Sequence, residues 1–320
     1  MAEKKAELLR KESGLYGFVP SAAASAFIAV SFLRGGGTTE SGVNFIFFLA
    51  VLSALSASAA IFALFSDSFG KTYYRSIPFI AVFFTALFLY ETLSTEAASA
   101  YFPTLGKIIT VLTEDRGIII KSIAHSLILL SSGYSLGAAA GFATGVAASS
   151  NRFCRYWLMP FVRVIGPIPA TAWIPLCIIL FPTFFSAGVF IIAVSVWFPV
   201  SVMTFSGILN VPQSFFDAGR VLGASPFRRA LFIAVPAALP AIFTGFFMGL
   251  GSSFLTLIAA EMTGVKAGLG FYIVWARDYA DYGRIFASLL ISSAIFFTIM
   301  TTLFKIRDRV LSWQKELIKW

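Results

Sequence analysis

The sequence predicts an all-α, polytopic membrane protein, and three observations carry this prediction. The mean hydropathy is +0.86, 58% of the 320 residues are hydrophobic, and only 12% are charged. Soluble domains, by contrast, carry about 25% charged residues. Apolar runs of roughly 20 residues also recur along the chain, and a helix of that length crosses a hydrocarbon core of about 30 Å.

Eight apolar runs are candidates for membrane-spanning helices. The first contains SAAASA inside the apolar stretch rather than after it, which favours an uncleaved anchor over a removed signal peptide. The uncharged FPTFF at 181–185 predicts a tight turn, and the connection at 95–125 has room for an amphipathic segment or two. The runs lie near 15–34, 43–65, 77–94, 126–148, 157–181, 184–208, 236–260 and 285–304.

The distribution of Lys and Arg predicts the orientation, because cytoplasmic loops retain these residues. With the amino terminus inside, sixteen of them fall on the cytoplasmic side and seven on the other side. We therefore expect a multi-pass protein of the plasma (inner) membrane with both termini cytoplasmic. The formal net charge of +9 follows from this topology and requires no nucleic-acid partner. Trp313 and Trp320 in the basic tail indicate contact with membrane lipid.

One polar segment on the cytoplasmic side, FFDAGRVLGASPFRR at 215–229, separates two long apolar runs. Pro212 is typical of a helix start and Gly223 of a helix stop, while Ser225 followed by Pro226 marks a second start. The pattern predicts two short helices joined by a glycine hinge, the second lasting until the next span opens. Amphipathicity alone favours an ordinary loop on the membrane surface.

The spacing within this segment favours a more specific interpretation. Asp217-Ala218-Gly219, three residues, Gly223, nine residues and then IAVP resemble the EAA motif, E-A-A-x3-G-x9-I-x-L-P, of permease subunits in ATP-binding cassette importers. The resemblance implies a coupling helix that docks on a cytoplasmic ATPase subunit, with small Ala218 and Gly219 permitting close approach and Asp217 pairing with a basic residue of that partner. The residues that the resemblance assigns to coupling, within 212–236, are Asp217, Ala218, Gly219, Arg220, Gly223 and Pro236.

Residues from about 77 to the carboxyl end also resemble the nitrate, sulfonate and taurine branch of these permeases. The similarity implies a six-helix permease domain at 77–320, preceded by two additional transmembrane helices at 1–76 that have no counterpart in the family pattern. It is carried by FPTLGKIITVL at 102–112, HSLILLSSGYSLGAAAGFATGVAASS at 125–150, IGPIPATAWIPLCIILF at 165–181, WFPVSVMTFSGI at 197–208 and FLTLIAAEMTGVKAGLGFYIVWARDY at 254–279.

The resemblance implies a transport subunit rather than an enzyme. Such a subunit forms the path for a small solute, here of the nitrate, sulfonate and taurine oxyanion class, together with a second permease copy. Separate cytoplasmic ATPase subunits hold the ATP and Mg²⁺, so this chain itself needs no cofactor, and an extracytoplasmic solute-binding protein delivers the solute. Relatives of similar appearance handle pyrimidine vitamin precursors, which leaves that substrate class as an alternative.

Prolines interrupt the fifth apolar run, and each of them removes a backbone donor. Broken spans occur at membrane depth where protein or a water-filled cavity satisfies the freed carbonyls, so we expect 163–176 to line the path. Arg163 could instead extend to lipid phosphates, and Glu261 could gate the path, contact the binding protein or cap a helix. The candidate path residues are Arg163, Pro167, Pro169, Trp173, Pro175 and Glu261.

A glycine stripe and the scarcity of ionisable residues complete the sequence pattern. Gly133, Gly137, Gly141 and Gly145 recur every four residues, which predicts close helix packing within the subunit or between two copies. An ion-coupled secondary transporter is the main alternative from another class of protein. Such transporters place ionisable side chains at mid-membrane, whereas ionisable residues are scarce in the apolar runs of this chain. The single histidine and two cysteines show no metal-binding or nucleophile-base spacing.

Overall fold

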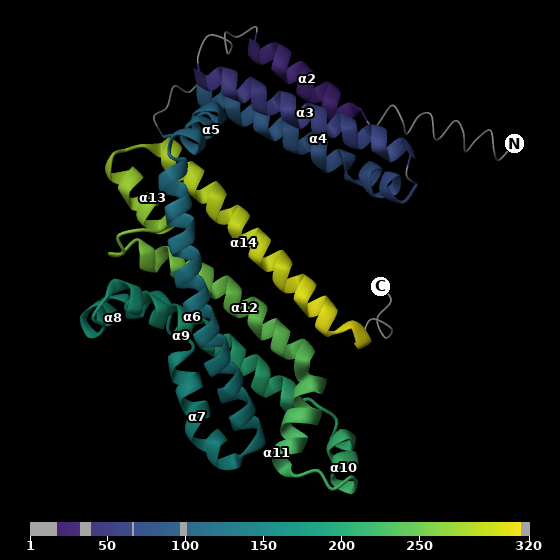
Figure 1. Ribbon diagram of the computed structural model, residues 1–320, viewed down its shortest axis with the longest axis vertical. Coiled ribbons are helices and arrows are strands. Elements are labelled where there is room, and N and C mark those ends of the chain that lie inside the picture. Colours follow the sequence, from purple (N-terminus) through teal and green to yellow (C-terminus); the bar gives the residue numbers. More distant parts are fainter. Residues whose placement is uncertain (1–17, 33–39, 66, 97–100, 315–320) are drawn as a thin grey trace, which may run out of the picture. The chain divides into compact units, whose positions relative to one another are not determined.

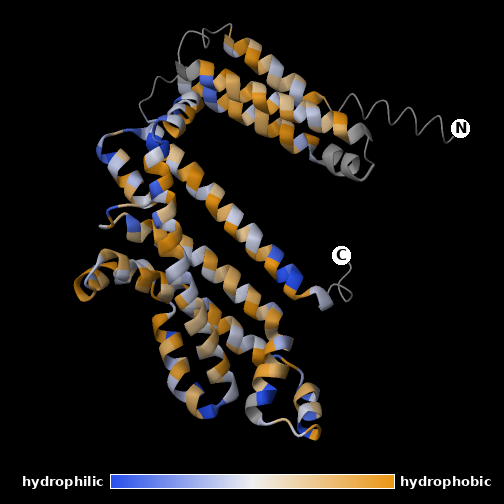
Figure 2. Ribbon diagram, viewed as in Figure 1, coloured by the Kyte–Doolittle hydropathy of each residue, from blue (hydrophilic) through white to orange (hydrophobic). Residues whose placement is uncertain are grey.

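The computed structural model describes residues 18–32, 40–65, 67–96 and 101–314, and every regular element within these ranges is a helix (Figure 1). The all-α class is therefore confirmed. Apolar residues run along most of the helices, and hydrophilic residues gather mainly near helix ends and connections (Figure 2).

Six helices are long and apolar enough to span a membrane. A bent pair, made of α7 (Arg152–Ile165) and the segment Ala170–Leu180, supplies a seventh if it counts as one span. The described residues thus hold six or seven candidate spans where the sequence predicted eight. The six are α3 (Glu40–Phe65), α4 (Asp67–Glu96), α6 (Arg116–Ser150), α9 (Phe184–Leu209), α12 (Val235–Glu261) and α14 (Tyr282–Val310).

The differences lie at the first and fifth predicted spans. Helix α2 (Val19–Ser31) has 13 residues, which is about 20 Å at 1.5 Å per residue and shorter than a hydrocarbon core of about 30 Å. Residues 15–17 and 33–34 of that run lie outside the described residues. The fifth run bends by 90° between α7 and the segment that follows, so it is not one straight helix.

Several connections are more helical than the sequence pattern predicted. Helix α4 already begins at Asp67, and α6 begins at Arg116, ten residues before the predicted apolar run. The expected amphipathic segment is α5 (Leu105–Glu114), whose first turn is capped by the Thr104 side chain. A further short helix, α13 (Leu269–Asp278), precedes α14 and was not predicted. The predicted turn at 181–185 is confirmed, since α8 (Ile174–Leu180) and α9 are separated by three residues.

The chain forms two compact units, which are described separately. Unit 1 holds residues 1–116 and 280–287. In it, Phe45 and Leu49 of α3 pack against Phe84 of α4, and the Glu91 carboxylate accepts the Leu105 N–H at 2.6 Å. The side chain of Arg284 lies 2.6 Å from the Asp115 carboxylate. Apolar packing, which includes Ala24 of α2, therefore joins α2, α3 and α4, and polar contacts tie α5 to α4 and to Arg284 of α14.

Unit 2 holds residues 117–279 and 288–320, and its core is formed where α9 packs against both α6 and α12. A Cβ added at Gly133 would lie 2.6 Å from Ile192, and one added at Gly145 would lie 2.5 Å from Thr204. The same side of α9 that receives the stripe contributes Val196 to the core. The predicted close packing along the glycine stripe is confirmed, and it occurs within the chain.

Candidate functional site

The predicted helix stop at Gly223 is confirmed by the backbone dihedral angle and the hydrogen bonds of this turn. Helix α10 (Gln213–Val221) follows Pro212 and has Leu222 as its C-cap, and Gly223 has a left-handed φ of +73°. The Gly223 N–H donates to the Arg220 carbonyl and the Ala224 N–H to the Gly219 carbonyl, both at 2.9 Å. This pair of bonds is a Schellman motif, which satisfies the last carbonyls of a helix where glycine takes the left-handed position.

The second short helix begins where the sequence predicted, but it does not end at the predicted residue. Ser225 accepts the Arg228 N–H at 3.4 Å and α11 (Pro226–Arg229) begins as expected, but a π-helix, η3 (Ala230–Ala234), then continues directly into α12. Pro236 is thus the second residue of α12 within one continuous helical path, not the start of a separate helix. The wider π turn accommodates a proline, which lacks an N–H and crowds the carbonyl four residues earlier.

Helix α10 exposes apolar side chains at its end. Val221 is 88% exposed and Leu222 is 85% exposed, although a soluble surface gains nothing from exposing large apolar groups side by side. Asp217 pairs with Arg220 at 3.1 Å, and both side chains are more than half exposed, so this ion pair adds little to stability. Ala218 is also exposed. The sequence interpretation passed over Val221, whose signal is an apolar pair directly before the helix-stopping glycine.

The sequence suggested that Gly219 faces a partner subunit, but in the structure its neighbours belong to the same chain. It is buried, and a Cβ there would lie 2.5 Å from Ile233 of η3 and 3.3 Å from the Arg229 stem. Its small size therefore serves close packing of α10 on η3 inside the chain rather than access for a partner. We call the arrangement of residues 212–236, with α10 folded back on η3, the elbow.

The predicted interruption of the fifth run is confirmed as a sharp bend. Helix α7 ends at Ile165, the short 3₁₀-helix η2 (Ala170–Trp173) follows, and α8 begins at Ile174. Residues 166–169, which include Pro167 and Pro169, lie outside regular helix. Backbone polar groups in such a break need protein or a water-filled space to satisfy them at membrane depth.

A cavity of about 670 Å³ adjoins this break, and we call it the path cavity. Pro167 and Pro169 line it, whereas Arg163 is exposed in the last turn of α7, Trp173 is half-buried and Pro175 is exposed on α8. Its walls on α9 and α12 escaped the sequence analysis because only tertiary packing brings them to the break. They are formed by Val194, Ser195, Phe198, Pro199, Met248, Gly251, Ser252, Leu255 and Thr256.

The path cavity is neutral and carries several hydroxyl groups. Ser195 donates to the Ile192 carbonyl at 2.7 Å, and Thr256 donates to the Ser252 carbonyl at 2.8 Å. None of the residues that line this cavity carries a charged side chain. A solute in this cavity would meet hydroxyl groups and the broken backbone rather than a charged side chain.

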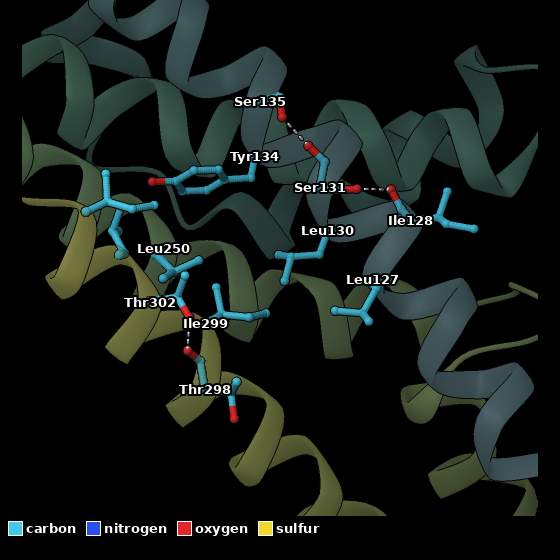
Figure 3. A pocket seen from close by; sticks show the side chains of 12 residues that line it. Leu127, Ile128, Leu130, Ser131, Tyr134, Ser135, Leu250, Thr298, Ile299 and Thr302 are labelled. Atoms are coloured by element: carbon cyan, nitrogen blue, oxygen red, sulfur yellow. Dashed lines mark hydrogen bonds between the residues drawn. The ribbon is translucent and has the colours of Figure 1, made fainter.

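A second cavity, of about 530 Å³, lies between α6, α12 and α14 (Figure 3). As in the path cavity, its Ser and Thr hydroxyls donate within their own helices, for example Ser131 to the Ile128 carbonyl and Thr302 to the Thr298 carbonyl (Figure 3). The Tyr134 hydroxyl donates to the Phe246 carbonyl of α12 at 3.1 Å. The remaining lining is almost wholly apolar, and the helices around it are unbroken. Because this second cavity adjoins no break in the helical backbone, the path cavity is the better candidate for transport.

Glu261 is buried, with 1% of its surface exposed, and it does not line the path cavity. Its carboxylate accepts the Ser126 hydroxyl at 2.6 Å and the Gly270 N–H at 2.9 Å. Gly268 precedes α13 with a φ of +135°, and any Cβ there would collide with the carboxyl group. Of the alternatives left open by the sequence, the structure supports helix capping, because the acid sits at the positive end of α13 and ties it to α6.

We expect Glu261→Ala to destabilise the protein by about 1–3 kcal/mol, because the Gly270 N–H and the Ser126 hydroxyl then lose their acceptor in a buried place. Glu261→Gln, which keeps one carbonyl oxygen, should cost less. Thermal unfolding of the purified protein in mild detergent measures both variants. An unfolding temperature for Glu261→Ala equal to that of the wild type contradicts the capping role.

Comparison with known proteins gives the family. Residues 133–312 match the family described as binding-protein-dependent transport system inner membrane component. The nitrate import permease protein NrtB of Leptolyngbya laminosa is 30% identical over 235 residues, which cover 69% of this chain and 82% of the relative. The bicarbonate transport system permease protein CmpB of Synechococcus elongatus is 32% identical over 209 residues, covering 64% and 70%. The putative aliphatic sulfonates transport permease protein SsuC of Bacillus subtilis is 31% identical over 188 residues, covering 59% and 66%.

A solved structure shares the fold. A chain of the MetNI methionine ABC transporter in an inward-facing conformation superposes with a TM-score of 0.53 at 17% identity, covering 61% of this chain and 97% of that chain. The family match spans more than half of the sequence. The chain belongs to the binding-protein-dependent transport system inner membrane components and is a permease subunit of an ATP-binding cassette importer.

Proposed function

We propose that the elbow at 212–236 docks on a cytoplasmic ATPase subunit and passes nucleotide-driven movement to α12. The observation that carries this proposal is the pair Val221 and Leu222, almost fully exposed at the end of the short amphipathic helix α10. The packing of Gly219 of α10 against Ile233 of η3 and the continuous helical path from η3 into α12 support it, because a push on α10 then reaches a spanning helix by direct contact. Asp217, Ala218 and Arg220 are exposed beside the apolar pair. Gly223 forms the turn between α10 and α11, and Pro236 lies in the first turn of α12.

The path cavity is proposed as this subunit's share of the translocation path, completed by a second permease copy. Its position at the helix break of 166–169 supports this role. Arg163, exposed in the last turn of α7, would draw an anion towards the break, while Trp173 and Pro175 shape the break itself. Glu261 acts on the path indirectly, by holding α13 in place.

The orientation and the domain division also enter the proposal. The α6–α7 turn, α10 and α11 lie at one end of unit 2, and α13 lies at the other (Figure 1). Within unit 2, the two loops that the Lys and Arg distribution assigns to the cytoplasm thus share one end (Figure 1). Counting the apolar run 15–34 as a span gives eight spans and places both termini in the cytoplasm, at the plasma (inner) membrane. Residues 1–76 would then be an addition to the permease body of 77–320.

The proposed solute is a small oxyanion, delivered by an extracytoplasmic solute-binding protein. Nitrate, bicarbonate and sulfonates, which the names of the similar permeases state, share this chemistry. A neutral cavity bordered by hydroxyls, with no fixed counter-ion to hold the solute, suits transit of an anion that the binding protein has already selected. ATP and Mg²⁺ are held by the ATPase and not by this chain.

A co-purification experiment tests the docking role. Tagged wild-type chain, Leu222→Asp and Leu222→Met are purified from the native membrane in mild detergent, and the associated proteins are identified. We expect an ATPase subunit to accompany the wild type and Leu222→Met, which keeps an apolar side chain, and to be lost from Leu222→Asp. Retention of the ATPase by Leu222→Asp, with the fold intact, excludes docking at this surface.

Uptake measurements test the solute class. Proteoliposomes that contain the permease, its ATPase and its binding protein are supplied with labelled nitrate, bicarbonate, an alkyl sulfonate or a pyrimidine. We expect ATP-dependent uptake of an oxyanion that is insensitive to a proton ionophore. Uptake of the pyrimidine alone assigns the alternative substrate class, and uptake abolished by the ionophore favours ion coupling.

A further inference from the structure

A third cavity, of about 300 Å³, lies directly behind the elbow. It is enclosed by the ends of α6 and α9, by α10 and by η3. Two arginines, Arg220 and Arg229, line it, and no acidic side chain does. We call it the elbow cavity. Its other lining residues are Ser149, Ser150, Ile208, Leu209, Val211, Gln213, Phe216, Ala230 and Ala234.

Arg229 does not lie on a fully exposed polar face, as it would in a simple amphipathic helix. Its side chain is half-buried, its stem packs beside Gly219, and its Nε is buried without a hydrogen-bond partner among the described residues. A buried donor of a charged group left without an acceptor is costly. The residue directly precedes the π-helix η3, and π turns are rare and often found at functional sites.

The nearby helix ends do not account for these arginines. Two carbonyls at the end of α6 are already engaged, since Arg155 donates to the Ala148 carbonyl at 3.1 Å and to the Ser149 carbonyl at 3.3 Å. At the end of α9, the Asn210 and Val211 N–H groups donate to the carbonyls of residues 206 and 208. The negative ends of both helices therefore have donors other than Arg220 and Arg229.

We propose that the elbow cavity binds a phosphate-class oxyanion between Arg220 and Arg229. Guanidinium groups bind planar or tetrahedral oxyanions through paired, charge-assisted hydrogen bonds, and the Arg229 Nε supplies a donor that lacks an acceptor. Arg220 shares its charge with Asp217 through an exposed pair at 3.1 Å, which is weak enough for an anion to compete. The anion is either a free cytosolic ion or the phosphate of a lipid headgroup.

The bound anion would bridge α10 and η3, the two arms of the elbow. A ligand that binds one geometry of this joint better than others shifts the joint towards that geometry. Occupancy would therefore stiffen the elbow and change how tightly ATPase movement is coupled to α12. This consequence rests on the proposed docking function, whereas anion binding itself does not.

Binding is measured on the purified full chain in mild detergent by titration calorimetry with inorganic phosphate and with sulfate, at constant ionic strength balanced with chloride. We expect saturable binding to the wild type. Arg229→Gln should weaken the affinity for the anion about tenfold or more, because a charge-assisted hydrogen bond is lost. The affinity of Arg229→Lys should lie between those of the wild type and Arg229→Gln, since lysine keeps the charge but not the planar pair of donors of a guanidinium group. Asp217→Asn should strengthen binding by freeing Arg220.

Arg228→Gln is the matched control, because it removes the same charge from the neighbouring position, which is exposed and does not line the cavity. We expect its affinity to stay within about twofold of the wild type, since exposed charges are screened. Equal weakening by Arg228→Gln, or no saturable binding to the wild type, overturns the proposal. Circular dichroism and thermal unfolding establish that each variant is folded. If Arg229→Gln does not fold, the affinity of Arg229→Lys tests the proposal instead.

Reconstitution into nanodiscs of neutral or anionic lipid distinguishes the two sources of the anion. Phosphate binding that anionic lipid suppresses assigns the cavity to a lipid headgroup, and binding that is equal in both assigns it to a free ion; both results support an oxyanion site. A different result, loss of the ATPase from Arg229→Gln with no anion binding to the wild type, assigns Arg229 to the docking surface and overturns the proposal. Because calorimetry uses no ATPase, failure here leaves the docking test of Leu222 unaffected.

Discussion

Replacing Gly223 by valine is expected to reduce ATP-driven transport about tenfold or more while leaving the membrane-spanning helices folded. Gly223 has a φ of +73°, a conformation that costs an L-residue roughly 1–2 kcal/mol and a β-branched residue more. Each 1.4 kcal/mol shifts an equilibrium about tenfold, here away from the native elbow. Solute uptake and co-purification of the ATPase measure the effect.

Gly223→Asn provides the control at the same position. No atom lies within 4 Å of a Cβ placed there, so valine and asparagine differ in the cost of the left-handed backbone and not in collisions. Asparagine tolerates this conformation better than other residues, and we expect it to retain most of the transport activity. Equal loss of activity in both variants would mean that the side chain at 223 itself obstructs docking, and equal retention would mean that the turn is not needed.

Gly137→Leu is expected to give the largest loss of stability, at or above the upper end of the roughly 1–3 kcal/mol that overpacking usually costs. Even a Cβ at Gly137 would lie 2.8 Å from the Val196 side chain and would collide with the backbone of α9 at Ala193. Backbone cannot move aside as a flexible side chain can, so α6 and α9 must separate. Thermal unfolding in detergent should show a clearly lower unfolding temperature.

Gly117→Leu is the matched control, because it makes the same substitution in the same helix. Nothing lies within 4 Å of a Cβ at Gly117, and leucine favours helix over glycine by up to about 1 kcal/mol. We expect its unfolding temperature to equal or exceed that of the wild type. If both leucine variants lose stability alike, the loss reflects added hydrophobic bulk in general, and the close contact between α6 and α9 is not its cause.

The elbow shows how far local signals reach. Proline, glycine and serine determine backbone conformation over a few residues, so the start at Pro212, the stop at Gly223 and the restart at Ser225 were predictable from sequence. The same signals ended the second short helix before Pro236, but the backbone stays helical from α11 through the π turn of η3 into α12, where Pro236 is the second residue. Whether a proline ends a helix depends on the width of the preceding turn, which neighbouring elements decide.

The contacts of Glu261 and Gly219 could not be predicted from the local sequence. An acid beside an apolar run is compatible with a gate, a partner contact or a cap, and only the approach of α6 and α13 brings Ser126 and Gly270 within bonding distance of its carboxylate. Gly219 lies in a motif that suggested access for a partner, yet Ile233 covers it from within the chain. Burial is a property of the folded neighbours and is not encoded at either position alone.

The sequence by itself determined the membrane class, most of the apolar helices, the close-packed stripe at Gly133 to Gly145 and the turn chemistry of the elbow, because these follow from periodicity, run length and backbone preference within a window of a few turns. The tertiary structure alone decided which residues enclose the path cavity and the elbow cavity, and that Arg229 lies half-buried behind α10. Those arrangements join helices that are distant in sequence, and the packing energy that selects them is spread over contacts that no local pattern contains.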